Sequence, residues 1–108
     1  MMEPGLDRHE WESEWQALEE QVADSPAESL VELDDLVGRM LDARGFPLAD
    51  PVALEGDERE VVSEFLAARE TMRLVEAGAD AVSPGDVAAA VNSYRAVYEY
   101  LVAERSAP

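Results

Sequence analysis

Apolar side chains recur along this chain at steps of three and four residues, which places them on one side of an α-helix. No segment alternates convincingly at the period of two that a half-buried strand requires. We therefore predict four helices, at about 7–23, 26–44, 58–77 and 84–105. The four apolar sets are Trp11, Trp15, Leu18 and Val22; Leu30, Leu33, Val37 and Met40; Phe65, Ala68, Met72 and Val75; and Val87, Val91, Tyr94, Tyr98 and Leu101.

Two Ser-Pro pairs predict where helices begin. Ser25 is expected to be the N-cap of the second helix, with Pro26 at its first position and Glu28 at its third, as in a capping box. The run 83–86, Ser-Pro-Gly-Asp, repeats this arrangement before the fourth helix, where Asp86 adds negative charge to the first turn. Both helices are therefore expected to start sharply.

Glycines predict where two helices end. Gly45 follows the last expected turn of the second helix and Gly78 that of the third, the position of a left-handed terminator. The first and third connections are short, about two to six residues, which favours antiparallel neighbours. The middle segment, Gly45 to Asp57, is longer and partly apolar, so we expect it to pack across the helices. The expected fold is an all-α four-helix bundle built from two antiparallel helical hairpins, forming one domain over 1–108.

The net charge restricts the range of possible functions more than any sequence motif does. The chain carries 25 acidic residues against 8 basic ones, all of them arginine, for a formal charge of −17. Such a chain is repelled by phosphate backbones and anionic lipids, so direct nucleic-acid binding and membrane binding are not expected. We expect a non-catalytic acidic interaction module, or an accessory or regulatory subunit, that binds a basic protein partner. A nucleic-acid mimic is an alternative, and it would need one continuous acidic ribbon.

Residues for most catalytic chemistry are missing. Cysteine and lysine are absent, His9 is the only histidine, and the glycines are isolated. We therefore predict that the protein is not an enzyme and that it binds no cofactor or metal. His9 itself is interpreted as a solvated residue of a helix start. Residues 1–5 lack the basic and apolar regions of a signal peptide, and no stretch approaches a membrane span of about 18 apolar residues, so a cytoplasmic location is expected. The absence of isoleucine beside abundant Ala, Val, Glu and Arg suggests a bacterial, GC-rich genome.

Carboxylate pairs leave a magnesium-dependent enzyme as a second alternative. All-α nucleotide pyrophosphatases bind magnesium through Glu-x-x-Glu and Glu-x-x-Asp pairs. This chain resembles them in one such pair, Glu32 with Asp35. With 25 carboxylates, such spacings also arise by chance. The pairs that share a helix face are Glu32 with Asp35, Glu10 with Glu14, and Glu60 with Glu64.

Three charged residues lie beside the apolar sets rather than opposite them. Asp34 flanks the stripe of the second helix, Arg69 interrupts that of the third, and Arg95 lies within that of the fourth. A carboxylate at the edge of a core requires a partner. We therefore predict that Asp34 or its neighbour Glu32 forms an ion pair at the core boundary with Arg69 or Arg95. Such a pair is more often structural than catalytic.

Three aromatic residues are candidate contacts for a partner. Trp11 and Trp15 are one helical turn apart, so they either fill the core, the favoured interpretation, or anchor a partner or a second copy of the chain. Tyr94 and Tyr98 are expected to face inward. Tyr100 falls outside that stripe and is the aromatic most expected to be exposed, as a contact point for a basic partner if acidic groups surround it.

The chain also resembles a group of small acidic helical proteins of actinobacteria. The segments that carry the likeness are 15–22, 24–28 and 32–37, together with Tyr94-Arg95, Tyr98 and Leu101 near the end. The chain departs from the group at Ala27, where the group tends to have arginine after the proline. The group has no established activity, so the resemblance implies an all-helical fold and assigns no site.

Overall fold

The computed structural model describes residues 4–46 and 56–106, with side chains over 9–46 and 56–103. These residues form four helices, α1 (Pro4–Asp24), α2 (Pro26–Ala43), α3 (Gly56–Glu76) and α4 (Pro84–Ser106), and contain no strand. The four predicted helices are confirmed, with each boundary within a few residues of its expected place. None of the four has an apolar stretch long enough to cross a bilayer.

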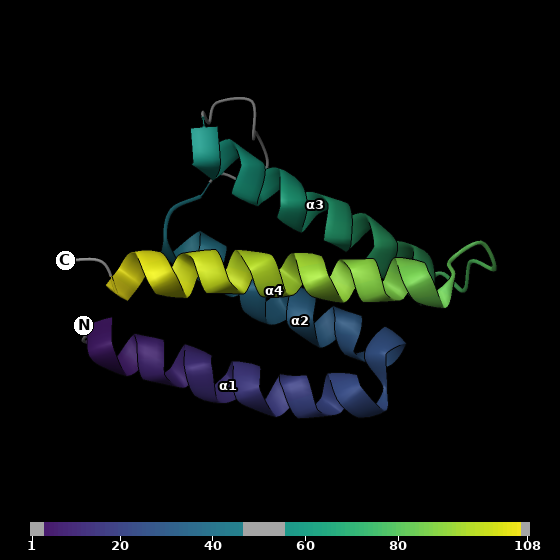
Figure 1. Ribbon diagram of the computed structural model, residues 1–108, viewed down its shortest axis with the longest axis horizontal. Coiled ribbons are helices and arrows are strands. Elements are labelled where there is room, and N and C mark those ends of the chain that lie inside the picture. Colours follow the sequence, from purple (N-terminus) through teal and green to yellow (C-terminus); the bar gives the residue numbers. More distant parts are fainter. Residues whose placement is uncertain (1–3, 47–55, 107–108) are drawn as a thin grey trace.

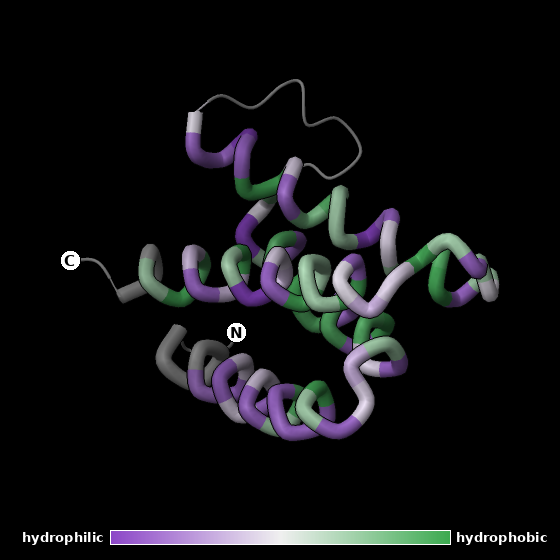
Figure 2. The backbone as a smooth tube through the Cα atoms, turned by 45° about the vertical axis from the view of Figure 1, so that its right-hand side comes forward, coloured by the Kyte–Doolittle hydropathy of each residue, from purple (hydrophilic) through white to green (hydrophobic). Residues whose placement is uncertain are grey.

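The helices form two antiparallel hairpins, α1 with α2 and α3 with α4, as predicted (Figure 1). α2 and α4 run in the same direction and pack against each other in the middle of the molecule. α1 and α3 lie on opposite sides of this central pair in Figures 1 and 2. The bundle is consequently flat, with extents of 44 × 32 × 21 Å.

α2 has the widest apolar face because it packs against all three other helices. Leu30, Leu36, Val37 and Leu41 are fully buried on it, and Figure 2 shows hydrophobic positions gathered where α2 and α4 meet. Burying a leucine side chain stabilises a fold by about 1.5 to 3 kcal/mol. α2 is therefore the helix on which the other three are assembled.

The two Ser-Pro starts differ in the structure. At α4, the Ser83 Oγ accepts a hydrogen bond from the Asp86 backbone N–H at 3.0 Å, and the Asp86 carboxylate accepts one from the Ser83 N–H at 3.0 Å. This reciprocal pair is a capping box. At α2 the predicted box is wrong, because the Ser25 side chain makes no capping hydrogen bond.

The reason is that α1 and α2 are separated by Ser25 alone, a shorter connection than expected. The Ser25 N–H donates to the Gln21 carbonyl at 2.7 Å and so still belongs to α1. Its carbonyl accepts from both the backbone N–H and the hydroxyl of Ser29, the latter at 2.7 Å. The backbone at Ser25 (φ −142°, ψ 75°) is fixed by closing one helix while opening the next.

The predicted glycine terminators are confirmed. Gly45 has φ +80° and Gly78 has φ +74°, conformations that L-residues rarely adopt. After each glycine the chain bonds back into the helix, with the Phe46 N–H donating to the Leu41 carbonyl at 3.0 Å. Phe46 is buried, which completes a Schellman motif at the end of α2. The rest of the middle segment, 47–55, lies outside the described residues, so its expected packing is not tested.

Candidate functional site

An acidic side chain in the core joins three helices. Asp34 of α2 is only 6% exposed. It accepts two hydrogen bonds from Arg69 of α3, from Nε at 3.1 Å and from a terminal nitrogen at 3.0 Å. The hydroxyl of the fully buried Tyr94 of α4 donates to the same carboxylate at 2.8 Å. The structure thus brings two of the three predicted core-boundary residues together and adds a tyrosine.

The surroundings of this pair are aromatic. The Arg69 guanidinium lies 4.6 Å from the centre of the Phe65 ring, and Phe65 meets Tyr94 edge to face at 5.9 Å. Gly38 makes room for the Phe65 ring, since a Cβ there would lie only 3.3 Å from it, whereas its distance of 3.5 Å from Arg69 would be an ordinary contact. Arginine held by a carboxylate and by an aromatic face is a strong arrangement, because the planar cation serves both at once.

Tyr94 is held in its protonated form in this arrangement. Burial, together with its hydrogen bond to the Asp34 carboxylate, raises the pKa of Tyr94 far above its usual range. The hydrogen bonds to Asp34 likewise raise the pKa of Arg69. Both groups therefore keep their protons at physiological pH, and the three side chains are a structural connection between α2, α3 and α4.

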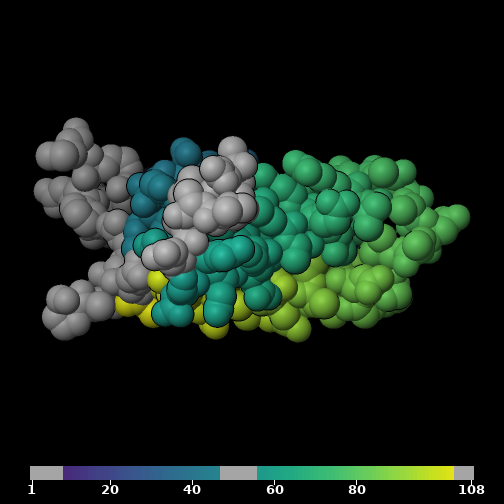
Figure 3. Space-filling view, turned by 90° about the horizontal axis from the view of Figure 1, so that it is seen from above, coloured from purple at the N-terminus to yellow at the C-terminus, as the bar shows by residue number. Residues whose placement is uncertain are grey.

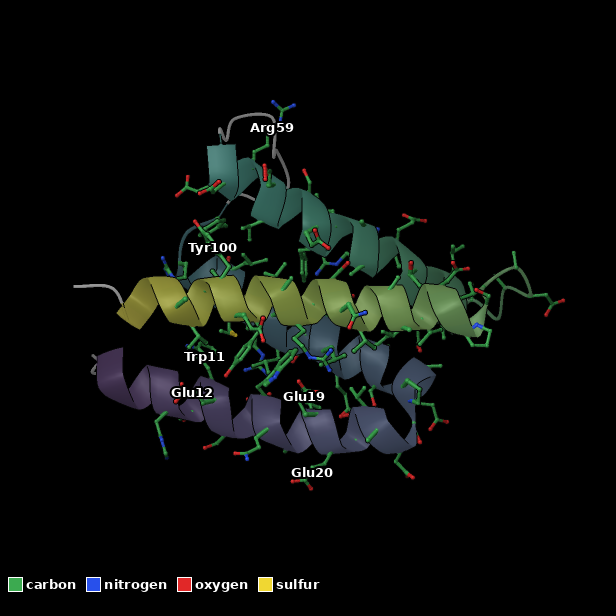
Figure 4. All side chains as sticks on the ribbon, in the orientation of Figure 1. Trp11, Glu12, Glu19, Glu20, Arg59 and Tyr100 are labelled. Carbon is green, nitrogen blue, oxygen red and sulfur yellow. The ribbon has the colours of Figure 1, made fainter. Side chains whose placement is uncertain are left out.

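Arg95, the other candidate partner of Asp34, binds a different carboxylate. It forms two hydrogen bonds with Glu19 of α1, at 2.9 and 2.7 Å, and so is not a partner of Asp34. These hydrogen bonds lower the pKa of Glu19. Figure 4 shows Glu19 directed from α1 toward α4, while Glu20 points away from the bundle. The sequence analysis missed Glu19 because its partner is 76 positions away and no local pattern connects them.

Trp15 lies beside this pair. Its ring nitrogen donates to Glu19 at 3.0 Å, and the ring stacks on Tyr98 of α4 with centroids 4.3 Å apart and planes at 6°. Trp15 is 7% exposed, so its assignment as a partner contact is wrong and the core interpretation holds. The apolar stripe of α1 predicts that Trp15 lies in the core. The one-turn spacing of Trp11 and Trp15 is the reason that both were also candidates for contact with a partner.

Trp11 is half-buried and belongs to a third arginine set. Arg39 of α2 lies 5.7 Å from the centre of its ring. The same guanidinium forms ion pairs with Glu14 of α1 and, at 3.0 Å, with Asp35 of its own helix. Arg39 thus connects α1 to α2 as Arg69 connects α3 to α2.

The carboxylate pairs considered for magnesium are partly used by these connections. Glu14, Glu32 and Asp35 line a hollow of about 540 Å³ between α1 and α2. Arg39 bonds to Glu14 and Asp35, and the Gln21 side chain donates to Glu32 at 2.6 Å, so Glu32 does not pair with Arg69 or Arg95. Within 4–46 and 56–106, no group of three or more His, Asp or Glu side chains could hold a metal ion.

A second acidic hollow, of about 260 Å³, lies between the start of α3 and the end of α4. α3 and α4 lie side by side along the face drawn in Figure 3. We call the hollow between the start of α3 and the end of α4 the α3–α4 hollow. One of its lining residues is the predicted contact residue Tyr100, which is partly buried. Its carboxylates are Asp57, Glu60 and Glu64, and its apolar floor is Val61, Val97 and Tyr100.

The acids of the α3–α4 hollow differ from those between α1 and α2. In the part of the chain that the structure describes, no side-chain hydrogen bond or ion pair involves the carboxylates of Asp57, Glu60 or Glu64. Arg59, next to Glu60 in sequence, is exposed and extends outward from α3, while Tyr100 lies on the side of α4 that faces α3 (Figure 4). No described side chain therefore offsets the negative charge of the hollow. His9, the lone histidine, is exposed at the start of α1.

No family model matches this chain, and neither a curated protein nor a solved structure matches it. The resemblance to the actinobacterial group stays a prediction.

Proposed function

We propose that this protein is a non-catalytic interaction module, an accessory or regulatory subunit, that binds a basic partner protein through its acidic surface. The observation that carries the proposal is the unequal use of charge. Arg39, Arg69 and Arg95 form ion pairs between helices. The carboxylates of the α3–α4 hollow, in contrast, have no partner among the described residues.

The electrostatics of these carboxylates favours a role in binding over a role in stabilising the fold. Asp57, Glu60 and Glu64 follow one another at three and four residues on a single helix face, where like charges repel by about 0.2 to 0.5 kcal/mol per pair. A basic partner would replace this repulsion by attraction, and long-range attraction would also speed its association.

Neither alternative gains a specific observation. The described carboxylates form no metal-binding group, so the magnesium-dependent hydrolase rests on sequence spacing alone. Exposed acids lie on all four helices, which does not favour the single ribbon that a nucleic-acid mimic requires.

The proposal is tested with the full chain as bait in an extract of its source organism at 50 and 500 mM salt. Proteins retained at low salt are identified, purified and titrated against the chain. We expect a basic partner whose dissociation constant rises steeply with salt. Recovery of no partner at low salt, or of one whose affinity ignores salt, would contradict the proposal.

A further inference from the structure

The two outer helices of the bundle are attached to it in different ways. α2, α3 and α4 each pack against the other two, so they form a closed three-helix unit. α1 packs chiefly against α2, on the side opposite α3 (Figure 1). α3 buries Val62 and Phe65 completely. Among the described side chains of α1, 9–24, only Trp15 and Leu18 are buried, and neither is buried completely.

Charged side chains supply much of the remaining attachment of α1. Arg39 of α2 forms an ion pair with Glu14, and Arg95 of α4 forms one with Glu19. The side chains of the first pair are a little under half exposed and those of the second about one-third exposed, so water and salt screen both pairs. The ion pair that joins α2 to α3 is, in contrast, largely buried. α1 is therefore attached by contacts that are individually weak.

The net charge of α1 opposes its docking. Residues 4–24 carry seven acidic side chains and one arginine, and the remainder of the chain is also net acidic. Repulsion between α1 and the three-helix unit therefore favours their separation. Arg39 and Arg95 offset part of this repulsion because each places a guanidinium against a carboxylate of α1.

Ser25 gives α1 a joint about which it can turn. The Ser25 N–H donates to the Gln21 carbonyl of α1, and the Ser25 carbonyl accepts from the Ser29 N–H of α2. The φ and ψ angles of Ser25 lie between these two groups, so a change in them reorients α1 while both hydrogen bonds are kept. The Ser25 side chain makes no capping hydrogen bond that would oppose the turn. A residue at a helix end that absorbs a change in φ and ψ is a hinge.

We propose that α1 is a displaceable arm, which opens as one unit about Ser25 while α2, α3 and α4 stay folded. The ion pairs of Arg39 and Arg95, together with the burial of Trp15, hold the arm closed. Opening exposes Trp15 and the Tyr98 ring on which it stacks, an aromatic surface that the closed form buries. This conformational device does not depend on the proposed binding of a basic partner.

Native-state hydrogen exchange of the full chain tests whether α1 opens alone. Segments that open separately exchange their amides through a lower free energy than global unfolding requires. We expect the amides of 12–22 to share one protection factor, about tenfold or more below that of the amides of 30–41 and 90–98. Equal protection of these three segments, with the same dependence on urea, would show that the helices open together and would overturn the proposal.

The role of the ion pairs is tested with two double variants of equal net charge. Glu14→Gln with Glu19→Gln removes both pairs. Glu10→Gln with Glu20→Gln removes two exposed acids of the same helix, and Glu20 points away from the bundle (Figure 4). We expect the first variant to lower the protection of α1 about tenfold, since one exposed ion pair accounts for up to about fivefold. The second should leave this protection unchanged or raise it, because it relieves repulsion.

The amides of α2, α3 and α4 verify that both double variants fold, and they should keep their wild-type protection. A fall in α1 protection of the same size in both variants would show that the ion pairs do not hold the arm. A fall shared by all four helices would mean that the whole bundle is destabilised together. Either result would overturn the proposal.

Tryptophan emission gives an independent measurement of the same opening. Trp11 and Trp15 are the two tryptophans of the chain and both lie on α1, so their emission reports the docking of this helix. Urea should shift the emission to longer wavelength at a lower concentration than it removes most of the helical circular dichroism, which reports all four helices. Coincident transitions by the two probes in the wild-type chain and in both variants would indicate a single cooperative unit and contradict a separately opening arm.

Discussion

At the scale of single residues, Asp34 illustrates how the bundle accommodates a buried charge. Its carboxylate accepts two hydrogen bonds from Arg69 and one from Tyr94. Taking a carboxylate out of water costs several kcal/mol, which only a close cation and well-placed donors offset. No buried side-chain polar atom of the described residues is left without a partner. The three side chains therefore depend on one another.

Changing Asp34 should destabilise the protein more than removing its tyrosine partner. Asp34→Asn leaves the Arg69 guanidinium, one quarter exposed, without its counter-charge, and should lower the free energy of unfolding by about 2 to 3 kcal/mol. Tyr94→Phe removes a single hydrogen bond and should cost about 1 kcal/mol. Urea denaturation measures both values. An asparagine variant as stable as the phenylalanine variant would contradict the role assigned to the ion pair.

Glu19 makes the stability depend on pH in a defined direction. Hydrogen bonds from Arg95 hold its pKa below the ordinary 4.5. Folding therefore favours the charged form, so this contribution is complete well above pH 4.5 and is lost as the pH falls through the lower folded value. The pair is about one-third exposed, which limits its contribution to about 0.5 to 1 kcal/mol.

The measurement compares wild-type protein with Glu19→Gln in urea at several pH values. The wild-type advantage should be present at pH 7 and should shrink toward pH 3, while general charge effects largely cancel between the two proteins. An advantage that is constant over this range, or that grows as the pH falls, would show that the Arg95 pair does not act through the charge of Glu19.

At the scale of helices, the two serines before prolines give a matched comparison. Ser83 caps α4 through its hydroxyl, and Ser25 makes no such bond at α2. Ser83→Ala should therefore cost about 1 kcal/mol of stability, and Ser25→Ala a few tenths at most. Thermal and urea melts of the two variants provide the measurement. Equal losses would mean that Ser25 acts as a cap in solution.

The helices were predictable from sequence because the information is local. Apolar residues at steps of three and four, a serine before a proline, and a glycine after the last turn each act within a few positions. Gly45 and Gly78 ended their helices as expected. Ser25 did not cap as expected, because its geometry depends on α1 and α2 meeting at one residue, and that closeness is a property of the hairpin.

The side-chain pairs were less predictable because they depend on how the helices pack. Asp34 was expected to bind an arginine, yet Arg69 and Arg95 stood at equivalent edges of their apolar stripes. Only the packing of α3 and α4 on α2 decides that Arg69 reaches Asp34 and Arg95 reaches Glu19. Likewise, the sequence marked Tyr100 as a contact residue but could not bring it beside Asp57 and Glu60.

At the scale of the whole molecule, the net charge of −17 opposes the compact fold. Repulsion among surface carboxylates is screened by salt, while the largely buried Asp34–Arg69 pair is screened much less. Raising sodium chloride from 20 to 500 mM should therefore stabilise the protein by about 1 kcal/mol and raise its melting temperature by roughly 5 °C. A melting temperature that falls with salt would indicate that exposed ion pairs outweigh the repulsion.

The internal arginine sets and the acidic surface form one design. Arginines between helices hold the flat bundle together. Under the proposed function, the acids of the α3–α4 hollow, which have no partner among the described residues, form the surface that binds a basic partner. Stability and binding then depend on separate residues. Variants of Glu60 and Glu64 should accordingly change affinity while leaving the melting temperature nearly unchanged.

The most direct test of this account is a map of backbone amide chemical shifts during titration of the ¹⁵N-labelled chain with hexa-arginine. The account predicts that the largest shifts cluster at Asp57–Glu64 and Ala96–Tyr100, the two segments that line the α3–α4 hollow. Shifts spread evenly over the acidic positions of all four helices, or concentrated between α1 and α2, would contradict it.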